Sequence, residues 1–184
     1  MSYNASHTPY NQSSEVRVSM MDSATPPAIA QGVDKNGLLL GRWRRGICSS
    51  SFEHPVPNTL MSFFCPGVSF AQISARLGLL SYSYVMLYFI LLYALCITAA
   101  VTKNHVVIAI CVFLSLVLLY SHMRLRWRIR QLFSIPGSIL EDFIYATFLG
   151  CFSISQMAMH VESYVPGDCT FSARATLPGY RSLN

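Results

Sequence analysis

The chain has 184 residues, of which 53% are hydrophobic and only 11% charged, and its formal net charge is +5. Soluble domains average about 25% charged residues, so this composition argues against an ordinary soluble domain. The positive charge comes almost wholly from arginines that flank an apolar block, where anionic lipid headgroups supply the partner, so we expect a lipid bilayer and no nucleic acid as the binding surface.

Residues 1–40 are rich in Ser, Asn, Pro and Gly and show no sustained hydrophobic periodicity. Such a segment has too few apolar side chains to offset the entropy of ordering it, so we expect a disordered cytosolic tail. Residues 42–58 follow, with Trp43 among arginines. An indole that is apolar in body and polar at its tip suits the headgroup layer, so this stretch is expected to lie on the membrane.

Residues 59–80 are apolar in two pieces that meet at Cys65-Pro66-Gly67. A Pro-Gly step removes a backbone donor and loosens a helix. Beyond it, apolar residues recur at near-helical spacing opposite Ser69, Gln72 and Arg76, which favours an interfacial amphipathic helix over a buried helix of a soluble domain.

Residues 81–101 and 105–123 are two uncharged apolar runs. A helix of about 20 residues crosses a hydrocarbon core of about 30 Å, so each run is long enough to span a bilayer. The short polar connection at residues 102–104 predicts two antiparallel neighbours. These segments therefore predict a two-span helical hairpin.

Orientation follows from the cations, because arginines flank both outer ends of the hairpin and Lys103 alone lies in its turn. By the positive-inside rule both termini are expected in the cytoplasm, and we expect a multi-pass protein of the plasma membrane. The arginines expected to contact lipid headgroups are Arg42, Arg44, Arg45, Arg124, Arg126, Arg128 and Arg130.

A further apolar helix is predicted at about residues 138–162, with Ser138 as its N-cap and Glu141 in its first turn. Its polar residues favour an amphipathic or re-entrant placement, while a third span at residues 143–160 remains the alternative. Residues 165–184 are expected to form a loose tail. The fold class is therefore an all-α membrane protein, with a membrane domain at residues 41–164 that surrounds the two-span hairpin with interfacial amphipathic helices.

The six cysteines are Cys48, Cys65, Cys96, Cys111, Cys151 and Cys169. Cys96 and Cys111 fall inside the expected spans, which favours reduced thiols over a disulfide framework. Residues 1–20 lack the apolar run of a signal peptide, so the internal spans are expected to direct insertion. Cys48 and Cys65 lie at expected membrane-surface positions, where S-acylation is a hypothesis.

Several short motifs surround the hairpin. They are Trp43 with Gly46-Ile47-Cys48, CPGVSFAQI at residues 65–73 before Gly78, Arg124-Leu125-Arg126 before Phe133-Ser134-Ile135, and Asp142 before Cys151 and Gln156. In this order they resemble the family of small cysteine-rich membrane proteins that includes the placenta-specific gene eight product, cornifelin, and the plant cadmium-resistance and cell-number-regulator proteins. The resemblance extends over residues 43–156 and implies an oligomeric membrane protein of divalent-cation homeostasis or transport, for calcium, zinc or cadmium.

The chain departs from the family pattern at two thiol-rich positions. Members typically show C-P-C where this chain has Cys65-Pro66-Gly67, and C-x-x-C-Q-E where residues 152–157 read FSISQM. These changes remove soft thiolate ligands that suit cadmium or zinc. They favour a second hypothesis, a non-transporting membrane adaptor, and an accessory subunit of a larger membrane complex is a third.

No catalytic constellation is present, so we expect neither an enzyme nor a cofactor. If the family's cation chemistry holds, the ligands available are the carboxylates of Glu141 and Asp142, with Cys65 as a thiol. The simpler interpretation of the two acids is that they complement a helix dipole, worth about 0.3 to 1 kcal/mol. Because two helices enclose no lumen, transport would require a homo-oligomer or a partner in a membrane complex.

Overall fold

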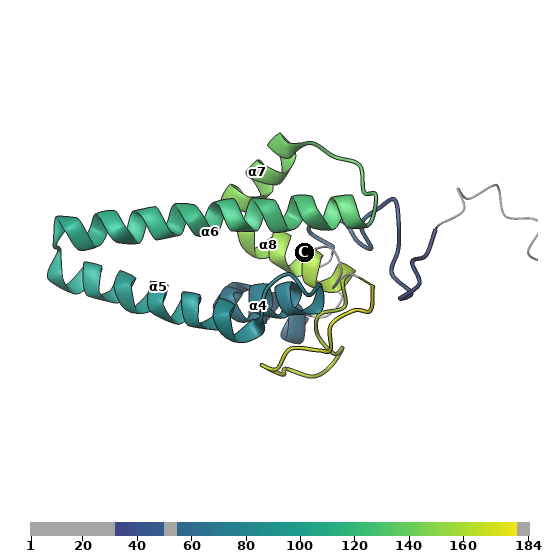
Figure 1. Cartoon of the computed structure of the whole chain (residues 1–184), viewed down its shortest axis with the longest axis horizontal. Coiled ribbons are helices and arrows are strands. Elements are labelled where there is room, and N and C mark those ends of the chain that lie inside the picture. The colour runs from purple at the N-terminus through teal and green to yellow at the C-terminus, as the bar shows by residue number, and fades with distance from the viewer. Residues whose placement is uncertain (1–31, 50–54, 180–184) are drawn as a thin grey trace, which may run out of the picture. The chain divides into compact units, whose positions relative to one another are not determined.

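The computed structural model describes residues 32–49 and 55–179, and its regular elements there are helices (Figure 1). One isolated bridge pairs Val33 with Leu39. The expected disordered tail falls mostly on residues 1–31, outside the described residues. In chain order the helices are η2 (Pro55–Leu60, a π-helical turn), α3 (Met61–Phe64), α4 (Pro66–Arg76), α5 (Tyr82–Thr102), α6 (His105–Leu132), α7 (Ile139–Phe148) and α8 (Gly150–His160).

The expected spans correspond to α5 and α6, and α6 continues well past the expected end of the second span. Lys103 adopts a left-handed conformation (φ 51°) that ends α5, and the side chain of Asn104 caps α6 by accepting from the backbone N–H of Val106. The two helices then run back along each other (Figure 1). The hydroxyl of Tyr88 donates to the carbonyl of Leu114 at 2.6 Å, which ties them midway.

Both long helices are apolar on surfaces that nothing in the described part of the chain covers. In their most apolar windows only 22% of α5 and 6% of α6 is buried. Large side chains such as Leu91, Ile97 and Phe113 are more than half exposed. Uncovered apolar surface of this extent is costly in water, and by length and composition both helices are long and apolar enough to cross a membrane.

The core lies where α4, α8 and the last turns of α6 meet. Ile73, Ile129 and Met157, one from each of these helices, have no exposed surface. Contrary to the expectation of an interfacial helix, α4 is buried along most of its length, from Gly67 to Ser74. Its polar residues tolerate burial because they find backbone acceptors: Gln72 Nε2 donates to the carbonyl of Thr170 at 2.8 Å, for example.

The predicted helix at residues 138–162 is two helices. Ser138 caps α7 as expected, since its Oγ accepts from the backbone N–H of Glu141 at 3.1 Å. Leu149 (φ −123°, ψ 35°) interrupts the helix, and α8 then packs its residues Ser153–His160 inside the domain. The ten residues of α7 rise only about 15 Å, half the length that a third span at residues 143–160 would need.

The ordered domain also extends beyond its expected ends. Leu38, which the sequence analysis places in the tail, is 2% exposed and belongs to the core. Residues 165–179 form neither helix nor strand, yet the backbone N–H of Leu177 donates to the carbonyl of Arg76 at 2.8 Å. Individual hydrogen bonds to α4, distant in the chain, therefore hold these residues in place. Amino-acid composition alone does not predict such bonds.

Candidate functional site

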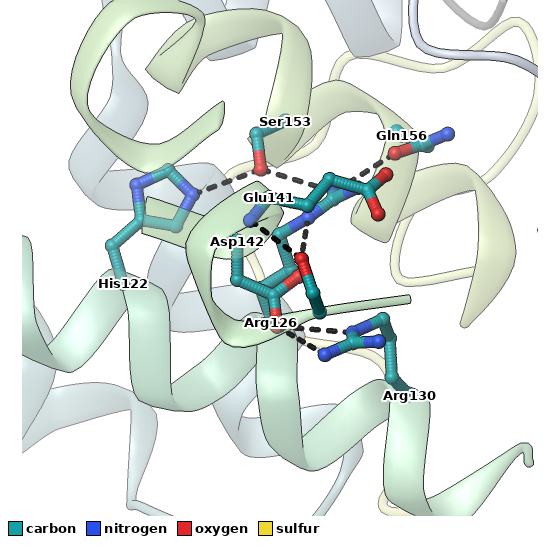
Figure 2. A network of polar contacts seen from close by, with 8 residues as sticks. His122, Arg126, Arg130, Glu141, Asp142, Ser153 and Gln156 are labelled. Atoms are coloured by element: carbon teal, nitrogen blue, oxygen red, sulfur yellow. Dashed lines mark hydrogen bonds and ion pairs between the residues drawn. The ribbon is translucent and has the colours of Figure 1, made fainter. Parts of the chain in front are cut away.

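The most concentrated polar chemistry in the described chain lies at the inner face of the last turns of α6. Arg126 and Arg130 stand one helical turn apart, so their side chains leave α6 on the same side. Both point toward α7 and α8, where Asp142 lies between them (Figure 2). Arg126 is 1% exposed, Arg130 5% and Asp142 not at all.

Asp142 uses both of its carboxylate oxygens on these two arginines. Oδ1 accepts from Arg126 Nε at 3.2 Å, and Oδ2 accepts from Arg130 Nε at 3.0 Å and from Arg130 Nη2 at 2.7 Å. Hydrogen bonds between ionised groups are roughly twice as strong as neutral ones. We call Arg126, Arg130 and Asp142 the arginine clamp, because it fixes α7 to α6.

A second nitrogen of the Arg126 guanidinium engages α8. Its Nη1 donates to Ser153 Oγ at 3.2 Å and to Gln156 Oε1 at 2.8 Å. The planar guanidinium also lies 4.6 Å from the ring centres of both Trp43 and Tyr145. Flanking aromatic faces supply cation–π attraction, which is stronger when water is excluded.

The clamp reaches the segment before η2 as well. Gln156 Nε2 donates to the carbonyl of Arg45 at 2.9 Å. At the opposite edge, His122 Nε2 lies 3.2 Å from Ser153 Oγ, within hydrogen-bond distance. The cluster therefore connects α6, α7 and α8 in one polar network (Figure 2). Through Gln156 and Arg126 it also contacts the segment at residues 43–45.

This arrangement is suited to holding helices together rather than to binding a cation. A divalent ion at Asp142 would have to displace one arginine and would meet the positive charge of both. Removing one partner of a buried ion pair typically costs about 3–5 kcal/mol, since a buried charge is left uncompensated. The physical role that the geometry supports is a structural lock at the end of α6.

A second buried polar group, His160, lies beside the same segment. Its Nδ1 accepts from the backbone N–H of Arg44 at 3.2 Å, and its ring contacts Trp43 and Phe133 edge to face. Burial, together with the nearby charge of Arg44, lowers the pKa of His160 to about 4. His160 is therefore neutral at physiological pH and acts as an acceptor that fixes residues 43–44.

The candidate metal ligands are not brought together. Glu141 is exposed, Asp142 is inside the arginine clamp, and Cys65 is half-buried just before α4. Within residues 32–49 and 55–179, no three His, Cys, Asp or Glu side chains gather closely enough to hold a metal ion. A metal role for Glu141, Asp142 and Cys65 stays a prediction without a shared site.

The seven arginines expected to contact headgroups divide into distinct environments. Arg126 and Arg130 are buried in the clamp, where they cannot face lipid without breaking it. Arg128 is half-buried. The exposed members are Arg42, Arg44, Arg45 and Arg124, of which Arg44 forms an ion pair with Glu162. Of the proposed acylation sites, Cys48 is exposed and Cys65 half-buried.

Sequence reasoning missed the pairing of Asp142 with two arginines. The available signal was the i, i+4 spacing of Arg126 and Arg130, which places both on one face of α6. The motifs around the hairpin were a second signal: Trp43, Arg126, Asp142 and Gln156 all carry the family resemblance, and the structure brings them into one cluster.

The comparisons with known proteins agree with that resemblance. No curated protein and no solved structure matches the chain. The model of the PLAC8 family matches residues 43–160, a segment that begins at Trp43, ends at His160 and contains the whole arginine clamp. The match covers more than half of the chain, and the protein belongs to the PLAC8 family.

Proposed function

We propose that the protein is a two-span protein of the plasma membrane, with both termini in the cytoplasm, and that it acts as a non-transporting adaptor. The observation that carries this proposal is that Asp142, which has no exposed surface, has both oxygens committed to Arg126 and Arg130. The polar residues of the domain then hold α6, α7 and α8 together on the cytoplasmic side instead of binding ions.

The membrane part of the proposal rests on α5 and α6. Each has at least 18 residues of high mean hydropathy, 2.3 and 2.4, and a surface that the described chain leaves largely uncovered. The turn between them carries Lys103 as its only cation, whereas the outer ends carry the arginines. The positive-inside rule accordingly puts the arginine clamp on the cytoplasmic side.

The thiol chemistry of the family supports the adaptor over a soft-metal transporter. Where members typically carry the second cysteine of C-P-C, this chain has Gly67, and a Cβ placed there would lie 2.7 Å from Phe89 Cγ. The ring of Phe89 therefore occupies the space of the missing thiol. Divalent-cation transport by an oligomer is the rival hypothesis, and it predicts a measurable flux.

Reconstitution into sealed vesicles separates the two hypotheses. Isotope flux of calcium and cadmium should remain at the level of protein-free vesicles for the wild type. Extraction from native membranes without detergent should give particles that contain other polypeptides beside the 20.5 kDa chain. A flux that disappears in Glu141→Gln at an unchanged amount of protein, in particles that are whole multiples of the chain mass, would overturn the adaptor proposal.

A further inference from the structure

A groove runs along the face of α6 that turns away from the arginine clamp. It consists of two cavities that share Phe70, Leu80 and Ser121 in their walls. The first has a volume of about 420 Å³ and the second about 250 Å³. The first volume lies within the range of about 300–1,000 Å³ that binding sites for small molecules occupy in proteins, and the second extends it.

The two cavities differ in the chemistry of their walls. The first includes the arginines Arg124 and Arg128 with Trp127 between them. The second lies between α5 and α6 and is lined by apolar and aromatic side chains, among them Val85 and Leu118. The groove is therefore cationic at one end and apolar at the other.

One face of α6 lines the groove from its apolar end to its cationic end. Leu118, Ser121, Leu125 and Arg128 follow each other at helical spacing and all line the groove. At about 1.5 Å per residue, Leu118 and Arg128 are separated by roughly 15 Å along the helix axis. The apolar end lies deeper in the proposed span, and the cationic end lies where α6 leaves it.

The walls of the groove contain arginines but no acidic side chain, since no Asp or Glu lines either cavity. Arg124 is exposed, with its guanidinium 4.8 Å from the ring centre of Trp127, and no carboxylate within the described ranges is in ion-pair distance of it. The arginines of α6 thus serve different faces: Arg126 and Arg130 neutralise Asp142, whereas Arg124 and Arg128 line the groove.

We propose that this groove binds one anionic phospholipid, with its phosphate at Arg124 and Arg128 and an acyl chain between α5 and α6. Guanidinium groups recognise phosphate oxygens in a planar, bidentate geometry, and a neighbouring tryptophan suits the headgroup level. In the proposed orientation the cationic end lies at the level of the lipid headgroups of the cytoplasmic leaflet, and the apolar end lies at the level of their acyl chains. This inference concerns the membrane domain itself and goes beyond the adaptor proposal, since a transporter could carry the same lipid.

The test compares phosphatidylglycerol with phosphatidylcholine of identical acyl chains, using the full chain in mixed nanodiscs. After transfer to detergent, native mass spectrometry counts the phospholipid that stays bound. The wild type should retain phosphatidylglycerol with roughly tenfold preference, as expected for two arginines at a membrane surface. Arg124→Gln with Arg128→Gln should bring the preference close to one.

Two further variants separate a built site from general attraction. Lys35→Gln with Arg42→Gln removes the same charge from exposed positions outside the groove and should keep the wild-type preference. Ser121→Phe fills the wall shared by both cavities and should reduce retention severalfold with both arginines intact. Should Arg128→Gln prevent folding, Arg124→Gln alone and Ser121→Phe still test the site.

Three results would overturn the proposal. If the Arg124 and Arg128 double variant and the Lys35 and Arg42 double variant lose the preference for phosphatidylglycerol equally, the preference comes from the overall positive charge and not from the groove. Unchanged retention in Ser121→Phe would exclude the acyl chain from the groove. Displacement of the lipid by water-soluble glycerophosphoglycerol at similar concentration would show that the headgroup alone is recognised.

Discussion

Gly67 of α4 lies directly against the ring of Phe89 of α5. A Cβ placed on Gly67 would come within 2.7 Å of Phe89 Cγ and 2.8 Å of Cδ1, closer than packed side chains allow. Phe89 is only 4% exposed and also contacts Phe70, so it has little room to move. The absence of a side chain at residue 67 is therefore what lets α4 pack against α5.

The first prediction follows from this contact. Gly67→Ala should lower the free energy of unfolding by about 1–3 kcal/mol, as overpacked cores do, and Gly67→Cys should cost at least as much. Gly150→Ala is the matched control, because its Cβ would meet only His122 Cε1 at 3.8 Å. Denaturant titration in detergent measures all three. Phe89→Leu should rescue part of the loss in Gly67→Cys, and a fully stable Gly67→Cys would contradict the packing.

A second prediction concerns the arginine clamp. Asp142→Asn leaves the buried charges of Arg126 and Arg130 without a counter-ion, so it should cost about 3–5 kcal/mol of unfolding free energy. Glu141→Gln, at the exposed neighbouring position, should cost no more than about 1 kcal/mol through the helix dipole. The same denaturant titration compares them. Equal effects of the two changes would show that the clamp does not stabilise the fold.

His160 predicts how stability depends on pH. Folding lowers its pKa from 6.5 to about 4, so between these values the unfolded chain binds the proton and the folded chain does not. The contribution of His160 to stability should be complete above pH 6.5 and should be lost, by roughly 3 kcal/mol, as the pH drops to 4. His160→Asn, which keeps an acceptor for the backbone N–H of Arg44 and does not titrate, should make the loss of stability over this range smaller by roughly that amount.

The control for that measurement is His105, which is exposed at the start of α6. His105→Asn should retain the wild-type profile in full. Unfolding is followed by denaturant titration at half-unit pH steps. If His160→Asn and the wild type lose stability in parallel, burial of His160 is not the source of the dependence.

The last prediction addresses topology. Epitope tags at residues 1 and 184 should both be accessible from the cytosol, because arginines are concentrated at both outer ends of the hairpin. A cysteine introduced at Asn104, one of the two exposed residues between α5 and α6, should react with an impermeant reagent from the opposite side. A tag at residue 184 that is reached only from outside would mean that the chain crosses the membrane a third time, against the break at Leu149.

Much of the helical architecture was predictable because its signals are local. The apolar runs at residues 81–101 and 105–123 became α5 and α6, and Ser138 caps α7 as its sequence context indicates. The family itself was recognisable from motifs around Trp43, Cys65 and Asp142, which the family match over residues 43–160 confirms. Hydrophobicity, helix caps and short motifs can all be read without knowing which segments meet.

Only the tertiary structure decided what the charged and polar residues do. Arg124, Arg126, Arg128 and Arg130 read as one basic stretch, yet helical geometry sends Arg126 and Arg130 inward to Asp142 and leaves Arg124 and Arg128 at the groove. The burial of α4 and the attachment of residues 165–179 likewise depend on distant carbonyl groups. Whether an arginine meets a carboxylate or a lipid is set by the segment that folds over it, and a contact between segments distant in the chain leaves no mark on local composition.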